Sequence, residues 1–415
     1  MYKNFKLKKY LLFLLISISF FKCKIDSRNT HKTVALSNNA KTLNFEINKN
    51  IFITSFDSIF KKEKLIKLET KPISLITNVY RVDYYNNNIY IIDSGTDYSV
   101  TCFDSKGTFK FKLKKIGRGP HEYTKIVYGA VNDYNGDIEI IANMGRDFIV
   151  YDSLGNFKER TKLPYTAKSF CSLKSKRYFY KGYVEQSENE NTNFRVYSTN
   201  YTGKDIKKYL PYLVSKNPEA GSHYLYGFSK RKKGEYRFVE KYNDTVYKIN
   251  SETFTPLYKI NFVGYEDNKP DNFLYDSEKY GNQMKKAKEL KIPSISNFQE
   301  YDSYITGKYT KIKNKKEYVY RFIYDKINKK IIQNRSMVPL SRRLNINTPE
   351  LLPDFSMNGT PSCYIYPVDI DNYINDSRLN HYEDEKKRRH ELTSYFEYDG
   401  NVDANPYILQ YKPLK

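Results

Sequence analysis

The loop from residue 117 to residue 122, Gly-Arg-Gly-Pro-His-Glu, has the clearest potential for chemistry. Glycines beside an arginine could cradle a phosphate group, but the loop lacks a Gly-Lys-Ser/Thr ending and no helical pattern follows it. A turn explains the pattern more simply, because glycine accepts a positive φ and proline fixes the start of the next strand. We keep Arg118 and His121 as candidates for ligand binding. The residues assigned to the turn itself are Gly117, Gly119 and Pro120.

Other polar patterns give little support for a metal site. Residues 133–137, Asp-Tyr-Asn-Gly-Asp, begin like a calcium-binding loop but lack the distant Glu, so a hairpin turn explains them. Asp369 and Asp371, with Asp376 nearby, are expected in a solvated loop. The five histidines are scattered, without the spacing of zinc ligands, at His31, His121, His223, His381 and His390. The sequence therefore predicts no metal site and no cofactor.

No catalytic motif is recognisable in the sequence. A Gly-x-Ser-x-Gly nucleophile elbow is absent. A triad assembled from distant strands would leave no local motif, since triads are recognised by geometry. We therefore leave open whether the protein is an enzyme and favour the interpretation that it is not.

Residues 1–22 have the pattern of a signal peptide. Four lysines precede an apolar run from Tyr10 to Phe21, which is too short to span a bilayer. Cys23 comes directly after this segment and resembles the lipidation site of a bacterial lipoprotein. Residues 23–44 are polar and lack periodicity, which is typical of a tether. Ordinary secretion and an uncleaved N-terminal anchor remain alternatives to lipidation.

Three cysteines remain if Cys23 is lipidated, so at most one internal disulfide can form. They are Cys102, Cys171 and Cys363. Cys102 lies in a strand-like run and is expected to pack as a small hydrophobic side chain.

The chain is strongly basic, with a formal net charge of +23. Such a surface could attract nucleic acid, lipid headgroups or acidic glycans. The lysines are spread over nearly every expected turn, which also fits an ordinary solvated surface. Because the signal pattern indicates export, we exclude nucleic acid as a partner.

A pair of repeats between residues 78 and 163 is the element that organises the chain. Residues 103–110 match residues 151–158 at an offset of 48, and each copy follows an Ile-rich strand. In each copy an Asp can bond its own backbone and a Gly accepts a positive φ, which is the chemistry of a hairpin turn. These residues are Asp104 and Gly107 in the first copy, and Asp152 and Gly155 in the second.

Short antiparallel strands in units of this length indicate the blades of a propeller, which bury each other's faces. Weaker copies follow around Tyr197, Tyr247 and Tyr324, with a helical insertion near residues 277–291. The two ends of the chain are expected to complete a sixth blade. The fold class is therefore all-β, a single six-bladed propeller of four-stranded antiparallel blades over residues 45–415.

This pattern resembles the six-bladed β-propeller lipoproteins of the bacterial cell envelope, relatives of the NHL-repeat propellers. The most specific segments are the Gly-Arg-Gly-Pro loop, in which His121 replaces an expected glycine, and the turn at Asn243 and Asp244. The other segments that carry the resemblance are Cys23 and residues 67–70, 89–93, 122–123, 242–247, 405–406 and 408–412. The resemblance implies a fold and an envelope location, but little about function, because the family's members mostly lack an assigned activity.

We expect an exported lipoprotein, in the outer membrane or periplasm, that binds a ligand or a protein or glycan partner through one face of the propeller. Loops on a rigid ring would supply its specificity, with Arg118 and His121 bordering the funnel. One alternative is an enzyme that uses the propeller centre to hydrolyse or cleave glycans. Another is a structural component of a surface assembly.

Overall fold

The two repeats fold into two consecutive antiparallel sheets of the same design. The first sheet contains β4 (Arg81–Tyr85), β5 (Asn88–Asp93), β6 (Ser99–Asp104) and β7 (Phe109–Leu113). The second contains β8 (Ile126–Val131), β9 (Ile138–Ala142), β10 (Asp147–Tyr151) and β11 (Phe157–Lys162). We call these sheets blades 1 and 2. Each is a meander in which consecutive strands are neighbours.

The third and fourth strands of each blade are joined by the same side-chain-stabilised turn. Asp104 Oδ1 accepts hydrogen bonds from the backbone N–H groups of Lys106 and Thr108, at 2.8 and 2.9 Å. Asp152 Oδ1 accepts the two equivalent bonds in blade 2. Gly107 and Gly155 have φ values of +94° and +88°, a region that glycine adopts without a steric penalty. The repeat in the sequence is therefore a repeat of this turn.

Three further blades have a related turn between their third and fourth strands, in which an Asn or Asp side chain accepts hydrogen bonds from the backbone N–H groups that follow it. It is built on Asn200 in blade 3, Asn250 in blade 4 and Asp325 in blade 5. Blade 3 contains β12 (Ser169–Ser172), β13 (Lys176–Tyr180), β14 (Thr192–Asn200) and β15 (Lys207–Leu213). Blade 4 contains β16 (Phe228–Lys232), β17 (Glu235–Phe238), β18 (Thr245–Ile249) and β19 (Phe254–Val263). Blade 5 contains β20 (Ser294–Glu300), β21 (Tyr304–Lys313), β22 (Lys316–Asp325) and β23 (Lys330–Met337).

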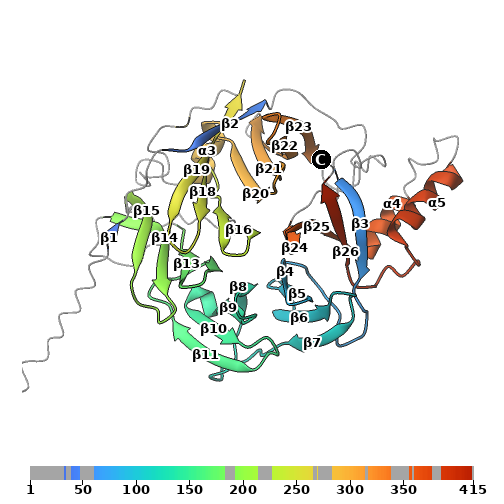
Figure 1. The fold of residues 1–415 in the computed structure, drawn as a ribbon, viewed down its shortest axis with the longest axis horizontal. Coiled ribbons are helices and arrows are strands. Elements are labelled where there is room, and N and C mark those ends of the chain that lie inside the picture. The colour runs from blue at the N-terminus through green and yellow to red at the C-terminus, as the bar shows by residue number, and fades with distance from the viewer. Residues whose placement is uncertain are drawn as a thin grey trace, which may run out of the picture. The chain divides into compact units, whose positions relative to one another are not determined.

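The sixth blade joins the two ends of the propeller. It contains β24 (Phe355–Met357), β25 (Thr360–Ile365), β26 (Tyr407–Pro413) and, as its outermost strand, β3 (Phe60–Lys67). β3 pairs antiparallel with β26, with Ile66 opposite Ile408. The prediction that the chain ends complete a sixth blade is confirmed, and the ring is closed by backbone hydrogen bonds (Figure 1).

This computed structural model describes residues 32–33, 39–46, 60–182, 192–213, 227–264, 269, 283–313, 316–337, 355–357, 359–375 and 385–413. Residues 33–415 form one compact unit, and the propeller lies within it. Cys23, the predicted lipidation site, and residues 1–22, the predicted signal peptide, lie outside the described residues.

Some elements lie outside the six meanders. A two-residue strand, β1 (Lys32–Thr33), precedes β2 (Lys41–Glu46), which adds to β19 as a parallel fifth strand of blade 4. β2 thus begins within the segment expected to be a tether. The helix expected near residues 277–291 is α3 (Gln283–Glu289). The other helices are the 3-10 turn η2 (Asn143–Gly145), α4 (Pro367–Ile374) and α5 (Glu385–Phe396).

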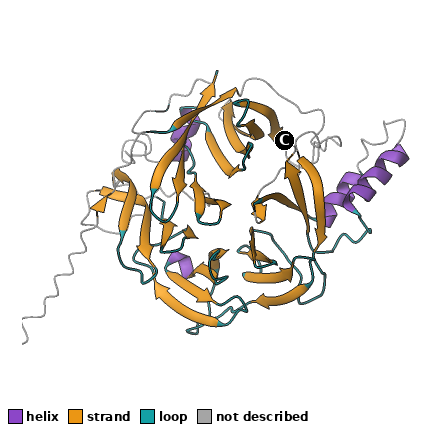
Figure 2. Ribbon diagram, in the orientation of Figure 1, coloured by secondary structure: helices purple, strands orange, loops and turns teal. Residues whose placement is uncertain are grey.

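Helices α4 and α5 lie outside the ring beside blade 6 (Figure 2). Ile370 and Phe396 from these helices pack in one apolar cluster with Tyr407 and Leu409 of β26. None of the described helices is both long enough and apolar enough to cross a membrane. The solvated loop predicted for Asp369 and Asp371 is wrong, because both lie in α4, where a proline occupies the first helical turn.

The core consists of large aromatic and β-branched side chains packed between neighbouring blades. One cluster joins Tyr90 and Ile92 of blade 1 to Ile140 and Tyr151 of blade 2. Stacking of this kind buries both faces of each sheet, which a single blade cannot achieve. The first strand of every blade faces the centre of the ring (Figure 1), and these strands position the site described next.

Candidate functional site

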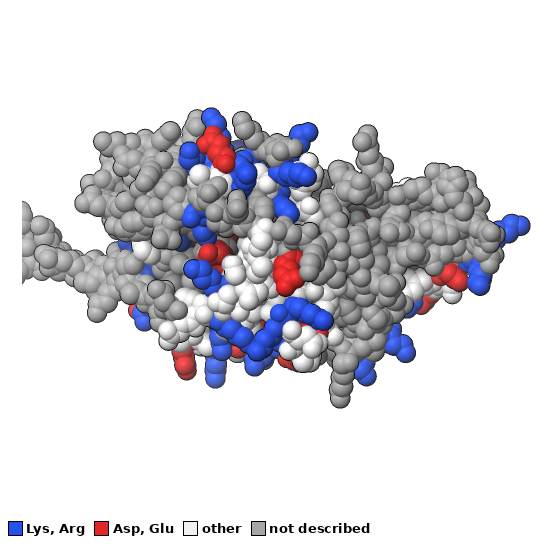
Figure 3. All heavy atoms as spheres, turned by 90° about the horizontal axis from the view of Figure 1, so that it is seen from above, with Lys and Arg blue, Asp and Glu red and all other residues white. Residues whose placement is uncertain are grey.

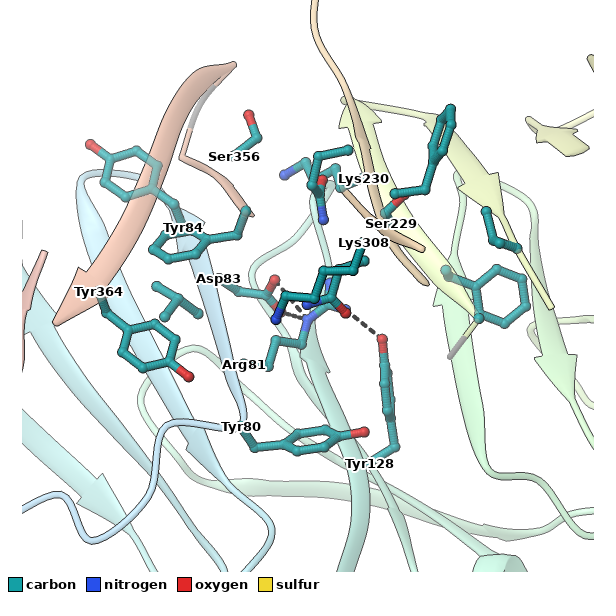
Figure 4. A pocket seen from close by; sticks show the side chains of 18 residues that line it. Tyr80, Arg81, Asp83, Tyr84, Tyr128, Ser229, Lys230, Lys308, Ser356 and Tyr364 are labelled. Atoms are coloured by element: carbon teal, nitrogen blue, oxygen red, sulfur yellow. Dashed lines mark hydrogen bonds and ion pairs between the residues drawn. The ribbon is translucent and has the colours of Figure 1, made fainter. Parts of the chain in front are cut away.

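A cavity of about 490 Å³ lies at the centre of the propeller. Its described lining comes from blades 1, 2, 4, 5 and 6, mainly from the first strand of each blade. This volume is in the range of small-molecule sites, which are typically about 300–1,000 Å³. Figure 4 shows the side chains that converge there from separate blades.

Tyrosines form much of the cavity wall. Tyr80 and Tyr84 come from blade 1, Tyr128 from blade 2 and Tyr364 from blade 6. The rings of Tyr80 and Tyr128 pack edge to face, with their centroids 6.0 Å apart. The Tyr364 hydroxyl donates to the carbonyl of Val79 at 3.2 Å. The wall therefore offers flat aromatic surface held in place by contacts between blades.

Arg81 and Asp83 form an ion pair in the cavity wall. Successive side chains of a strand alternate between its two sides, so residues two apart on β4 lie on the same side. Arg81 Nε donates to both carboxylate oxygens of Asp83 at 2.9 Å, and Nη1 donates to the hydroxyl of Tyr128. The backbone N–H of Val131 also donates to Asp83, at 2.8 Å. Burial by itself lowers the pKa of Arg81, but Asp83 and, to a smaller extent, Tyr128 together more than compensate, and the net pKa is raised.

Lys230 contributes a second cation to the cavity from blade 4. Its ammonium group pairs with Asp133, which lies after β8 of blade 2. The Tyr236 hydroxyl donates to the other oxygen of Asp133 at 3.3 Å. Burial raises the pKa of Asp133, and Lys230 opposes that shift only in part. This pair joins two blades that are not consecutive in the ring.

A β-bulge in blade 5 shapes the opposite side of the cavity. Ser296 pairs with Lys308 and Gln299 with Thr306, so β20 has one residue more than β21 in this interval. Asn297 has a φ of +48°, a conformation that asparagine adopts more readily than most residues. Bulges re-aim side chains and occur often beside functional sites. Here the bulge directs polar residues from β20 to the cavity lining.

The described lining of the cavity contains few groups that titrate, apart from its cations and tyrosines. Among the described lining residues, Asp83 has the only carboxylate, and there is no histidine or cysteine. That carboxylate already accepts hydrogen bonds from Arg81 and from the Val131 backbone. In the described part of the chain, no group of His, Cys, Asp and Glu residues could hold a metal ion.

The loop at residues 117–122 connects β7 to β8 and packs against the outer strand of blade 2. Arg160 Nη1 donates to the carbonyls of Gly119 and Glu122, at 3.1 and 3.2 Å. The Glu122 carboxylate accepts from the Gly119 N–H at 2.8 Å. A Cβ on Gly117 would lie 1.9 Å from that carboxylate, so only glycine fits there without rearrangement.

The two candidate ligand-binding residues of this loop are both exposed. The ring of His121 stacks on Phe157, with centroids 4.0 Å apart. Neither Arg118 nor His121 is among the residues that line the central cavity. A binding role for them stays a prediction, and it would concern a surface outside this cavity.

The turn at residues 243–244 lies between β17 and β18. Asn243 Oδ1 accepts from the N–H of Thr245 at 3.0 Å, and its amide donates to Glu240 at 3.4 Å. Asp244 pairs with Lys269 at 2.9 Å. Both side chains therefore have structural contacts in this turn.

The residues that line the cavity were not identified from the sequence. Arg81, Asp83 and Lys308 lie in first or second strands, outside the repeated turns. A local signal did exist, since Arg81 and Asp83 flank Val82 in the first strand of a blade, and stacking of the blades buries both faces of each sheet. Charged residues two apart in such a strand indicate an ion pair facing the propeller centre.

The family model described as "Domain of unknown function (DUF4934)" matches residues 40–412. The structure of a protein from Bacteroides fragilis, described as a "Putative exported protein", is similar to this chain with a TM-score of 0.66 and 18% identity; the alignment covers 90% of this chain and 99% of the other. A DUF4221 family member from Bacteroides vulgatus aligns with a TM-score of 0.50 and 11% identity, over 86% and 98% of the two chains. A search of the curated proteins gave no match. At these identities the similar structures support the fold alone.

Proposed function

We propose a function from the geometry of the cavity, because the chain belongs to the DUF4934 family, which has no assigned activity. The protein is an exported, envelope-anchored propeller that binds a small ligand in its central cavity. The observation that carries the proposal is the cavity of about 490 Å³ lined by tyrosines and cations from five blades. Aromatic walls with a few polar groups are typical of ligand sites. The six-bladed ring holds these groups in fixed positions, which reduces the entropic cost of binding.

A binding role agrees better with the lining than the enzymatic alternative. A glycan hydrolase generally needs two carboxylates, one of them acting as general acid or base. Asp83 is held by Arg81 and by a backbone N–H, and Asp133 is engaged by Lys230 and Tyr236. Both carboxylates therefore hold other residues of the cavity wall in place, and neither is left without a partner to act on a substrate.

The export and the anchor are part of the same proposal. They are supported by the signal pattern of residues 1–22 and by Cys23, and by the similarity to a protein described as exported. Labelling cells with a palmitate analogue tests the anchor. The wild-type protein should incorporate the label and Cys23→Ala should not. Equal labelling of both would refute lipidation at Cys23.

Native purification from the cell envelope, followed by denaturation and mass spectrometry of the released material, tests the binding role. The wild-type protein should release a stoichiometric compound. Ser356→Trp fills the cavity from β24 and should release none. Ser105→Trp is the matched control, because Ser105 is equally half-buried but lies in an outer turn of blade 1.

The same experiment separates the alternatives. An oligosaccharide returned in shortened form would support an enzyme. A compound recovered equally from the wild type and Ser356→Trp would show that binding does not use the cavity, and the proposal would then be abandoned. A protein partner retained by Ser356→Trp would instead favour the surface-assembly interpretation.

A further inference from the structure

Two segments of the chain meet at one end of blade 2 and form a surface that we call the loop patch. They are residues 115–125, which lead into β8, and residues 143–146, which join β9 to β10 and include η2. β8 and β9 are antiparallel, so the start of β8 and the end of β9 lie at the same end of the blade. The N–H and the hydroxyl of Thr124 donate to Asn143 Oδ1 at 2.9 and 2.8 Å, which joins the two segments. The described lining of the central cavity includes no residue of the loop patch.

The loop patch exposes two large apolar side chains. Met144 is 89% exposed and Ile116 is 48% exposed. Met144 lies between Asn143 and Gly145, and the three residues have φ values of +51°, +63° and +85°. A positive φ is costly for residues other than glycine, and such strained positions occur often at functional sites. The carbonyl of Gly145 accepts from the N–H of Ala167 at 2.9 Å, so this turn is also attached to the segment that leads into blade 3.

The charged side chains around these apolar tips are mostly cations. Four are exposed and have no ion-pair partner in the described part of the chain: Lys115, Arg118, Lys125 and Arg146. The neighbouring carboxylates are already engaged. Asp97 pairs with Lys112 and Lys114, and Glu122 accepts from the N–H of Gly119 at 2.8 Å. The loop patch therefore carries an excess of positive charge.

We propose that the loop patch docks on a membrane surface that contains anionic phospholipids. Met144 and Ile116 enter the headgroup region, and the four cations lie against the lipid phosphates. Basic residues beside exposed apolar side chains are the combination that binds anionic membrane surfaces. The core of a protein interface is instead depleted of charged residues, lysine in particular, so the four cations favour lipid over a protein partner.

This docking does not depend on a ligand in the central cavity. The envelope anchor proposed above would keep the loop patch close to a membrane, and docking would then fix the orientation of the propeller on it. Arg118, which the sequence analysis kept as a candidate for ligand binding, would contact lipid phosphate in this arrangement.

A fluorophore placed in the loop patch tests the inference. In a Cys23→Ser background the three remaining cysteines are buried, so Met144→Cys can be labelled selectively with the environment-sensitive fluorophore NBD. Leu154→Cys is the matched control. Leu154 is 72% exposed and lies between β10 and β11, at the opposite end of the same blade. Each labelled protein is titrated with vesicles of phosphatidylcholine, or of phosphatidylcholine mixed equally with phosphatidylglycerol.

We expect the emission of the probe at position 144 to brighten and shift to the blue with the anionic vesicles, and to change much less with phosphatidylcholine alone. The probe at position 154 should remain in water with both. Raising the salt from about 50 mM to about 500 mM should weaken the response at position 144, because screening acts on charge. Residues 1–22 are identical in both labelled proteins, so they cannot cause a difference between the two probes.

Variants connect the response to the cations of the loop patch. Lys115→Gln/Lys125→Gln, combined with the probe at position 144, should raise the lipid concentration needed for half of the response about tenfold. Lys106→Gln/Lys174→Gln removes the same charge from exposed turns at the opposite end of blades 1 and 3 and should change nothing.

An unchanged emission at position 144 with both kinds of vesicle would overturn the inference. Equal responses to the two lipid compositions, equal responses at positions 144 and 154, or a response that survives Lys115→Gln/Lys125→Gln would also overturn it. A response to native envelope membranes but not to pure lipid would mean that the loop patch binds another component. A response to protein concentration without vesicles would indicate docking on a second copy of the chain. Either of these two results would likewise refute docking on lipid.

Discussion

Arg177 of blade 3 donates from Nη2 to Oε1 of Glu139 in blade 2, at 2.9 Å. Both side chains are almost completely buried, with exposed fractions of 7% and 1%. The guanidinium also lies over the rings of Phe148 and Tyr201, at 4.4 and 4.2 Å from their centroids. The contact therefore combines a charge pair with cation–π packing across the boundary between two blades.

Two other buried pairs join consecutive blades in the same way. Arg195 of blade 3 contacts Glu240 of blade 4 at 3.2 Å, and Arg237 of blade 4 contacts Glu300 of blade 5. A buried ion pair is a costly way to stabilise a fold, but it strongly disfavours any register that separates the charges. We infer that these pairs fix how the blades stack around the ring.

Glu139→Ala should lower the free energy of unfolding by about 3–5 kcal/mol, because it leaves the buried charge of Arg177 without its main partner. The double variant Glu139→Leu/Arg177→Met removes both charges and should recover most of that loss. Urea unfolding followed by circular dichroism measures both. Glu63→Ala in the exposed part of β3 is the control and should have no measurable effect. A double variant as unstable as the single one would contradict this view of the pair.

Gly107→Ala tests the contact between the first and last blades. Gly107 has a φ of +94°, its carbonyl accepts from the N–H of Glu69 at 2.8 Å, and an added Cβ would lie 2.1 Å from the Lys67 carbonyl oxygen. Because Lys67 ends β3, the clash would fall on the strand that closes the ring. We expect Gly107→Ala to lower the free energy of unfolding by more than the roughly 1–2 kcal/mol that the left-handed backbone conformation alone costs an L-residue.

Gly400→Ala is the matched control for Gly107→Ala. Gly400 has a similar φ of +86°, but an added Cβ would meet no atom within 4 Å. Urea unfolding of the two variants separates backbone strain from the clash with β3. Equal losses of stability would mean that the contact with Lys67 is unimportant for closure.

The fold could be predicted from the sequence because the turns between its strands are specified by residues close together in the chain. Asp104 and Gly107 act within one four-residue turn, and the same pair recurs at Asp152 and Gly155. Later copies can have Asn in place of Asp, as at Asn200, whose Oδ1 still accepts a hydrogen bond from the backbone N–H of Lys204. A pattern whose function is complete within a few residues recurs in blades 1 to 5 and is visible without a structure.

The cavity could not be predicted in the same way. The repeated turns join the third and fourth strands, at the outside of each blade, whereas the cavity is lined mainly by first strands. Each first strand makes a different contribution, such as Arg81, Tyr128 and Lys230. These residues are far apart in the chain and come together only when the ring closes.

The sequence shows that the chain is basic, but it does not show which of the cations are exposed and which are paired. Figure 3 shows Lys and Arg side chains spread over one face, with fewer Asp and Glu among them. The sequence could count these residues, but it could not separate exposed lysines such as Lys106 from Lys230, which is paired inside the cavity. Burial and pairing depend on contacts between blades.

The contributions of Glu300 and Glu240 to the free energy of unfolding should change with pH in opposite directions. Burial alone raises the pKa of Glu300, but Arg237 and Lys326 more than compensate, and the net pKa lies below the ordinary value of 4.5. Glu300 therefore stabilises the fold fully above pH 4.5, and this stabilisation is lost as the pH falls through its folded pKa. Burial raises the pKa of Glu240, and Arg195 opposes this only in part. Its ionisation therefore weakens the fold as the pH rises above 4.5.

This contrast is tested by measuring the free energy of unfolding between about pH 3 and pH 8. The proteins to compare are the wild type, Glu300→Gln and Glu240→Gln. The advantage of the wild type over Glu300→Gln should grow with rising pH up to about 4.5 and then stay constant. Its advantage over Glu240→Gln should shrink as the pH rises above that value. If both differences change with pH in the same direction, the assigned shifts are wrong.

The three described cysteines should be unreactive thiols in the folded protein. Cys102, Cys171 and Cys363 are free and buried, which agrees with the expectation that Cys102 packs as an apolar residue. Burial raises the pKa of Cys102 to about 12, so the reactive thiolate is scarce at neutral pH. In a Cys23→Ser background, Ellman's reagent should detect almost no thiol in the native protein and three after unfolding in urea without reductant. Reductant should leave the thermal midpoint unchanged. Detection of a single thiol in the unfolded, unreduced protein would reveal a disulfide and contradict the free thiols of the fold described here.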